Sequence, residues 1–419
     1  MTRRLAAPVA LLAGLIAAVT VVLGGPLAAT AGAERRIEVP PEVMKLYQQK
    51  PVIELVTMGV GALIWERHGH IALCVQYDDR RHDCYNYGIG DFSHPVGMAW
   101  GFFRGTGSFW VGRDSIENML WIYKYTDRTI WVQPLPLTRE QKQQVIDKLE
   151  HDIQEPYKYY AYDHFWDNCT TRVRDMLNDA TGGKLAAMHE PTDGKTFRDL
   201  AREGFHGLHM PDPVPDTVPL VITDIAMGRV TDRVPTYYER MFLPQYLREA
   251  ATKLWGIQPI AIYERRGPPA ETDGPSGRGG FALVLLLLTA PAWITRLLGR
   301  GQRAGLAIAV IPYVLLGTVL TALAIISPLP YVRWNETCLV LLPLDLLVLF
   351  LPAQSRWYAR GRLAMLALLL VLDLVGVLTQ PLLVPLLWPA IPLAVVGLWP
   401  APPAKVGMAG QLDGGGKRG

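Results

Sequence analysis

The chain has 419 residues, a formal net charge of +3 and 50% hydrophobic residues. This length allows more than one domain. The small charge, with no long block of Lys and Arg, excludes a nucleic-acid footprint, so no nucleic-acid partner is expected. The cysteines are too few for a disulfide scaffold and match no zinc spacing, so neither a metal nor another cofactor is expected. They are Cys74, Cys84, Cys169 and Cys338.

Residues 1–33 have the pattern of an export signal. Arg3 and Arg4 precede an apolar run, and the small residues Ala-Thr-Ala-Gly-Ala follow it, as in a signal peptide. The apolar run is long for a signal peptide, so an uncleaved N-terminal anchor is the alternative. Either way, the chain from about residue 40 onward is expected outside the cytoplasmic membrane.

Residues 36–264 are predicted to form one mixed α/β domain. Runs of β-branched and apolar residues predict its strands, and apolar residues at helical spacing behind Thr138 and around Cys169 predict its helices. The expected strands are 56–63, 71–77, 84–89 and 129–135, and the expected helices are 138–153, 168–180 and 234–254.

A Pro/Gly linker, 265–280, leads to a predicted transmembrane domain of five helices within 281–400. Several of its apolar segments approach the ~20 residues that a bilayer-spanning helix needs. Arginines gather in the first and third short loops of this region, so the positive-inside rule places 36–264 outside and the tail 401–419 in the cytoplasm. The segments are 281–298, 305–327, 337–352, 363–380 and 382–399.

Two carboxylates, Asp345 and Asp373, fall in the middle of these segments. A lone charge inside a bilayer is costly, so both are expected to face each other or another polar group, not lipid. Intramembrane carboxylates also allow a different class of function, a non-catalytic scaffold or a transporter-like protein.

Cys169 and His70 are the candidate catalytic pair. If Asp167 or Asn168 caps the helix, Cys169 lies in its first turn, where the helix dipole favours a thiolate. An imidazole such as that of His70 can remove the thiol proton. The alternative is that Cys169 is only a small buried apolar residue.

Other histidines and cysteines leave further alternatives open. In a strand, His68 would share one face with His70, so His68 could itself be the base. His68 and His70 could also bind a metal with His164 and Cys169, although no HExxH or paired CxxC motif supports this. Cys74 and Cys84 flank a predicted turn in an oxidising compartment, so they form either a disulfide or two small buried residues.

Three groups of residues form a more specific pattern. They are Trp65, His68-Gly69-His70, Tyr85-Asn86-Tyr87-Gly88 and Asp91-Phe92; Tyr162-Asp163 with Asn168-Cys169-Thr170-Thr171-Arg172; and Thr231-Asp232-Arg233 with Phe242-Leu243-Pro244. The pattern resembles the Lnb-type family of bacterial lipoprotein N-acyltransferases, which have an exported N-terminal domain and a C-terminal membrane domain. The order of histidine before cysteine also resembles circularly permuted papain-like domains of the NlpC type.

The resemblance implies a fold, a site and a location. The fold would be an α+β, circularly permuted papain-like extracytoplasmic domain followed by an all-α multi-pass transmembrane domain. The site would be a Cys169–His70 pair, with Asn86 as our candidate for orienting His70 and Asp163 as the second candidate. The protein would lie in the bacterial inner membrane, with its catalytic domain on the periplasmic side.

The resemblance also implies an activity. A cysteine-dependent acyltransferase would move a fatty acyl chain from a phospholipid, through a thioester, to the N-terminal amine of a lipoprotein. Phospholipid, lipoprotein and membrane are therefore the expected partners. The alternatives are a cell-wall thiol peptidase or amidase, and the non-catalytic scaffold.

Overall fold

A computed structural model describes residues 39–91, 93–210, 214–351 and 354–399. The predicted export signal and cytoplasmic tail lie outside these ranges. The chain divides into two compact units, Met1–Leu220 with Val234–Pro275, and Val221–Arg233 with Ser276–Gly419.

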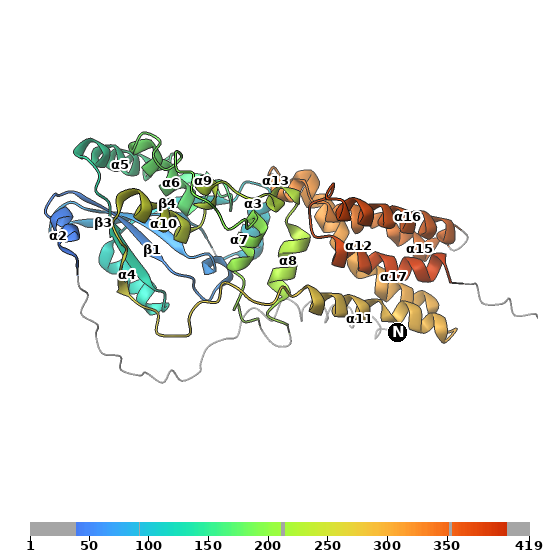
Figure 1. The fold of residues 1–419 in the computed structure, drawn as a ribbon. Coiled ribbons are helices and arrows are strands. Elements are labelled where there is room, and N and C mark those ends of the chain that lie inside the picture. The colour runs from blue at the N-terminus through green and yellow to red at the C-terminus, as the bar shows by residue number, and fades with distance from the viewer. Residues whose placement is uncertain (1–38, 92, 211–213, 352–353, 400–419) are drawn as a thin grey trace, which may run out of the picture. The chain divides into compact units, whose positions relative to one another are not determined.

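The first unit is built on a seven-stranded antiparallel sheet (Figure 1) with the order β6-β4-β3-β2-β1-β5-β7. The expected α+β architecture is therefore confirmed for this unit. Its strands are β1 (Val52–Met58), β2 (His70–Gln76), β3 (His82–Ile89), β4 (Ser108–Ser115), β5 (Ile130–Pro134), β6 (Tyr159–Ala161) and β7 (Ile260–Tyr263).

Helices cover both faces of this sheet, because alternate residues of a strand point to opposite sides. Ile71 and Leu73 of β2 belong to the hydrophobic core that α5 (Arg139–Asp152), α6 (Cys169–Ala180) and α10 (Pro244–Trp255) complete on one face. Ala72 and Cys74 belong to a separate core with α4 (Ile116–Tyr125) on the other face. The remaining helices are α2 (Pro41–Tyr47), η2 (Ile64–Glu66), α3 (Pro95–Phe103), α7 (Phe197–Glu203), α8 (Val218–Ala226), η3 (Arg229–Asp232) and α9 (Tyr237–Arg240).

Four strands, β1, β4, β6 and β7, differ from the sequence prediction, and no strand was expected at the short β6 and β7. The strand expected at 56–63 is β1, which ends at Met58 because the chain then turns into η2. β4 was not predicted at all. Its buried residues Phe109 and Val111 alternate with Trp110 and Gly112, but the polar residues that follow shorten the apolar pattern.

The structure settles the choice at Cys74 and Cys84. They are directly opposite each other in the antiparallel pairing of β2 and β3, and they form a disulfide. Both half-cystines are fully buried in the core on the α4 face.

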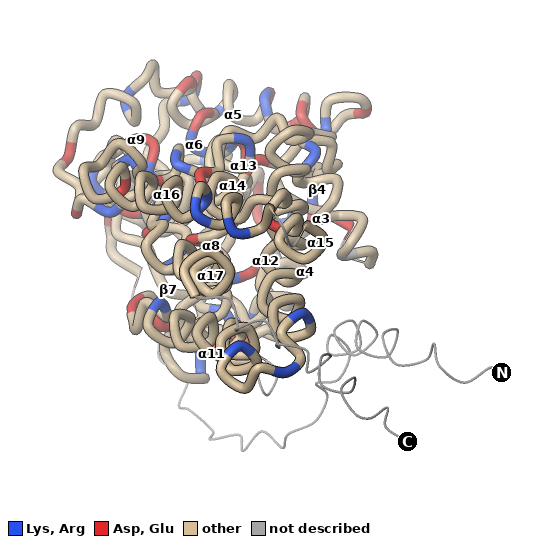
Figure 2. The backbone as a smooth tube through the Cα atoms, turned by 90° about the vertical axis from the view of Figure 1, so that its right-hand side faces the viewer, with Lys and Arg blue, Asp and Glu red and all other residues tan. Residues whose placement is uncertain are grey.

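The second unit is helical. Two of its described helices, α11 (Arg278–Leu297) and α12 (Gln302–Ile326), are long and apolar enough to cross a membrane. α17 (Leu383–Gly397) is shorter, and it carries no charged residue, so Figure 2 draws it in tan throughout. The others are α13 (Pro330–Arg333), α14 (Thr337–Val340), η4 (Pro343–Leu346), α15 (Leu347–Phe350) and α16 (Ser355–Leu374).

The third predicted membrane helix is not continuous. Residues 337–352 form α14, η4 and α15 instead of one helix, and the break falls just before Pro343, whose ring cannot continue a helix from the preceding turn. Residues 221–233, expected in the first domain, belong to the helical unit. Gly228 donates its N–H to the carbonyl of Tyr331 at 2.6 Å, and Asn335 donates its amide to the carbonyl of Ile225 at 2.8 Å.

Asp345 has a polar partner, as expected, but the partner is Arg362 and not Asp373. The Arg362 Nε and Nη2 donate to the two carboxylate oxygens at 2.8 and 3.1 Å, and Tyr358 donates its hydroxyl to the same carboxylate at 2.7 Å. Asp345 is fully buried. Arg362 therefore lies inside α16 as an ion-pair partner, and not in the cytoplasmic loop to which the sequence pattern assigned it.

Candidate active site

Asn168 is the cap that places Cys169 at the start of α6. Its backbone is extended, and its side-chain oxygen accepts hydrogen bonds from the N–H groups of Thr170 and Thr171 at 2.8 and 2.9 Å. Thr171 returns the contact by accepting the Asn168 N–H at 2.7 Å. Asp167, the other candidate cap, instead binds Arg172 through two hydrogen bonds. Cys169 is therefore the first residue of the helix, as predicted.

The Cys169 thiol is buried beside strand β2. Its sulfur accepts a hydrogen bond from the backbone N–H of Ile71 and lies 3.7 Å from the Thr170 hydroxyl. Burial raises the pKa of the Cys169 thiol, although these hydrogen bonds act in the opposite direction. Only a thiolate is a strong nucleophile, so this thiol requires a base.

His70, the first residue of β2, is held in a form that can act as that base. Its Nε2 lies 3.2 Å from the side-chain oxygen of Asn86 on β3. An amide oxygen only accepts hydrogen bonds, so Nε2 carries the proton and Nδ1 keeps a free lone pair. Burial, and then the positive charge of Arg128, lowers the pKa of His70 to about 4. The imidazole is therefore neutral at pH 7 and able to accept a proton.

The structure brings the three predicted residues to one end of the β2–β3 pair. Ile71, which binds the Cys169 sulfur, directly follows His70. Gly88, two residues after Asn86, lies so close to Cys169 that a Cβ on it would be 3.4 Å from the Cys169 Cβ. Gly88 has a φ of +83°, which also favours glycine.

A cavity of about 370 Å³ opens beside this group, and His70, Asn86 and Gly88 all line it. Tyr123 of α4 and Arg128 line it as well. The Tyr123 ring stacks on the His70 ring with a centroid distance of 6.1 Å, and the Arg128 guanidinium carbon lies 4.7 Å from the Tyr123 ring. No sequence pattern pointed to Tyr123 or Arg128, because only the packing of α4 on the sheet brings them to this cavity.

His68 has a different environment. Gly69, with a φ of +75°, turns the chain between the two histidines, so His68 does not share the strand face of His70, contrary to the prediction. The His68 Nε2 lies 2.9 Å from the carbonyl oxygen of Ala201, and its ring packs against His164 at 4.7 Å. Of the two histidines, His70 alone has a hydrogen bond to Asn86 and a place in the cavity beside Cys169.

Asp163 does not orient His70. Its carboxylate accepts the backbone N–H groups of Phe165 and Trp166 at 2.9 and 3.1 Å, and so shapes the turn before α6. The second candidate for this role is therefore wrong.

The described residues do not gather His68, His70, His164 and Cys169 into a metal-binding group. The one group close enough to bind a metal in this part of the chain is Glu54, Cys74 and His82, and Cys74 is held in the disulfide.

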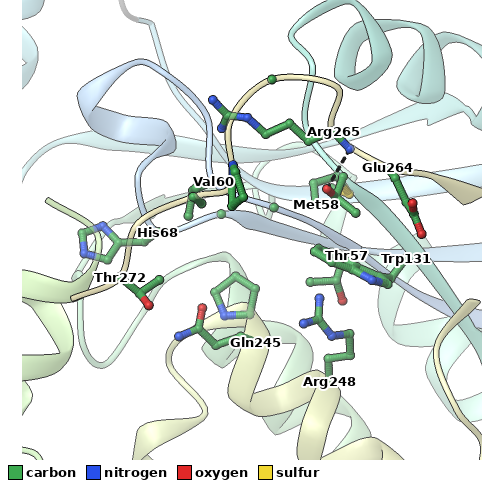
Figure 3. Close-up of a pocket in the computed structure, with 17 residues that line it drawn as sticks. Thr57, Met58, Val60, His68, Trp131, Gln245, Arg248, Glu264, Arg265 and Thr272 are labelled. Carbon is green, nitrogen blue, oxygen red and sulfur yellow. Dashed lines mark hydrogen bonds between the residues drawn. The ribbon is translucent and has the colours of Figure 1, made fainter. Parts of the chain in front are cut away.

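A second cavity, of about 380 Å³, lies on the other side of the His68–Gly69 turn. Figure 3 shows Gln245 and Arg248 of α10 directed toward the strand that carries Thr57. Arg248 stacks on the Trp131 ring at 3.9 Å. His68 lines this cavity, whereas His70, Asn86 and Gly88 line the other, so the cavity beside His70 is the candidate active site.

Comparison with known families supports the resemblance found in the sequence. Residues 44–203 match the family model of the Lnb N-terminal periplasmic domain. Residues 44–203 are therefore a domain of the Lnb N-terminal periplasmic type. The matched residues run from α2 to α7 and include His70, Asn86 and Cys169. No curated protein and no solved structure gives a significant match. The periplasmic family and the two apolar helices together indicate a membrane protein with a periplasmic domain.

Proposed function

We propose that this protein transfers a fatty acyl chain from a phospholipid to the N-terminal amine of bacterial lipoproteins, through a thioester on Cys169. The observation that carries the proposal is the His70–Asn86 hydrogen bond beside a cysteine at a helix start. A neutral imidazole held in one tautomer, next to a thiol, is the arrangement that nucleophilic catalysis by cysteine requires.

The first half-reaction forms the thioester. His70 Nδ1 takes the Cys169 proton as the sulfur attacks an ester carbonyl of the phospholipid. The oxyanion then collapses, the ester C–O bond breaks, and the departing lysophospholipid oxygen takes the proton from His70. The N–H groups of Thr170 and Thr171 already bind Asn168, so among these first-turn groups the N–H of Cys169 is the available oxyanion donor.

The second half-reaction consumes the thioester. The amine of the lipoprotein's N-terminal cysteine attacks the thioester carbonyl, and His70 takes the proton that the amine loses. The C–S bond breaks, an amide forms, and the proton returns to the Cys169 sulfur. Water competes with the amine, so burial of Cys169, which is 9% exposed, favours transfer over hydrolysis.

Intact-mass analysis of the full-length protein tests the proposal. After incubation with phospholipid, the wild type should carry one fatty-acyl adduct, and Cys169→Ala should carry none. Cys338→Ala is the matched control, because Cys338 is the other free cysteine among the described residues, and this variant should keep the adduct. An adduct on Cys169→Ala would contradict the proposal.

A cellular assay separates the alternatives. Loss of lipoprotein N-acylation in cells that carry Cys169→Ala supports acyl transfer. Intact N-acylation with altered cell-wall fragments would favour the peptidase or amidase. No change in either would favour the scaffold.

A further inference from the structure

Arg128 has no role in the half-reactions above, yet it lies in the same cavity as His70. It connects α4 to β5 and is only 4% exposed. A buried cation beside a catalytic base lowers the basicity of that base, as Arg128 does here for His70. Its position therefore requires an explanation other than proton transfer.

The protein supplies hydrogen-bond or ion-pair partners for only some of the Arg128 guanidinium nitrogens. Nε donates to the carbonyl of Gly59 at 2.8 Å, and Nη1 lies 3.5 Å from the carboxylate of Glu66. Nη2 is enclosed and has no hydrogen-bond partner among the described residues. Buried polar groups are nearly always paired, so an unpaired nitrogen on a side chain that lines a cavity suggests that a ligand completes it.

The chemistry of this nitrogen favours an anion with several oxygens. A guanidinium presents a planar set of donors that matches phosphate, and it stays charged when buried. A phospholipid supplies such a group on the same molecule as the reacting ester. His70 and Arg128 both contact the ring of Tyr123, so one bound molecule can place its ester at His70 and its phosphate at Arg128.

The mouth of the cavity suits the rest of a lipid. Trp65 and Ile122 line the cavity and are also 47% and 41% exposed. Aromatic and aliphatic side chains at a cavity mouth can contact acyl chains, while the polar groups lie deeper. Apolar side chains therefore lie at the exposed part of the cavity beside polar ones such as Arg113, and Arg128 is buried within it.

We infer that Arg128 binds the phosphate of the acyl donor and so selects a phospholipid over an uncharged ester. This inference rests on the proposed acyl transfer, and it adds a recognition residue that the reaction itself does not require.

Donor selectivity is the test, with the full-length protein in detergent micelles. Acyl transfer is measured from a diacyl phospholipid and from diacylglycerol with the same chains. Arg128→Gln should lower the rate with phospholipid by about tenfold or more, because a charge-assisted contact is lost, and should change the rate with diacylglycerol far less. Arg248→Gln is the matched control, since Arg248 lines the other cavity and stacks on Trp131. It should leave the ratio of the two rates unchanged.

An unchanged ratio of the two rates would overturn the inference. If both rates fall equally, Arg128 would instead act on the reacting carbonyl or on the fold. If Arg128→Gln does not accumulate as folded protein, Arg128→Lys keeps the charge without the planar set of donors, and it should show the same change in ratio to a smaller degree. A wild type inactive on both donors would instead contradict the proposed function.

A binding experiment is independent of acyl transfer. sn-Glycerol 3-phosphate should slow the alkylation of Cys169 by iodoacetamide in the wild type and not in Arg128→Gln, with Cys338 as the internal reference. Absence of protection in the wild type would overturn the phosphate site, even if acyl transfer is observed.

Discussion

Two residues of β3 determine whether His70 can act on Cys169. Asn86 holds the imidazole in one tautomer. Gly88 packs against Cys169, since a Cβ there would be in van der Waals contact with the Cys169 Cβ, the Tyr162 ring and the Tyr160 hydroxyl, and its φ of +83° favours glycine. The proposed catalytic geometry therefore depends on a strand that contains neither Cys169 nor His70.

Gly88→Ala should lower acyl transfer per folded molecule by about tenfold or more, because relief of the strain at φ +83° would shift a strand that packs against Cys169, and a displaced nucleophile loses much of the benefit of orientation. The control is Gly182→Ala. Gly182 has a similar φ of +67°, but a Cβ there would meet nothing within 4 Å. The Gly182→Ala variant should lose about 1–2 kcal/mol of folding free energy from backbone strain, and its rate of acyl transfer should not change. Equal rates for the two variants would show that the contact at Gly88 has no catalytic effect.

The pH dependence of thioester formation follows from the lowered pKa of His70. Neutral His70 persists down to about pH 4, so the acid limb of kcat/KM should lie near that value and not near the ordinary histidine value of about 6.5. Release of lysophospholipid without an amine acceptor is the measurement, because the acceptor amine has its own titration. Asn86→Ala removes a hydrogen bond that raises the pKa of His70, so the acid limb of kcat/KM should move to lower pH. A shift of this limb to higher pH would contradict the environment described for His70.

At the scale of elements, local chemistry allowed much of the site to be predicted. The strand at His70, the cap at Asn168 and the helix behind it depend on residues close together in the sequence, and all were expected. Tyr123 and Arg128 could not be predicted, because they reach the cavity only when α4 packs on the sheet. The likeness to papain-like folds stays a prediction, since no solved structure matches.

The Cys74–Cys84 disulfide should stabilise the first unit without contributing to catalysis. It joins residues separated by 10 positions, so removing it should cost roughly 2–3 kcal/mol through the extra freedom of the unfolded chain. A Cys74→Ala, Cys84→Ala double variant should therefore have a lower Tm and a normal rate well below that Tm. Dithiothreitol should lower the Tm of the wild type and not that of the double variant. An unchanged Tm would contradict a stabilising bond.

At the scale of the whole molecule, the number of membrane crossings is the open prediction. The sequence pattern predicted five crossings, whereas α11 and α12 are the two described helices that meet the length and composition of a span. The number of crossings stays a prediction, and hydropathy alone does not detect the break at Pro343 or the burial of Arg362 against Asp345. Both depend on contacts between helices.

A fluorescent protein fused after Gly419 tests the crossing number by parity. With the first unit in the periplasm, five crossings place the fusion in the cytoplasm, where it should fluoresce. Protease added to spheroplasts should cut within 265–280 and spare the fusion. An even number of crossings, such as two, would leave the fusion dark and open to digestion.

The Asp345–Arg362 pair imposes an order on the synthesis of the helical unit. Asp345 leaves the ribosome before Arg362, so for a time the carboxylate has no counterion. An unpaired charge is poorly tolerated in a bilayer, and a buried charge that has lost its partner is strongly destabilising. The segment that contains η4 and α15 is therefore expected to await α16 and to insert with it as one hairpin. A chain truncated between them should be a substrate for membrane proteases.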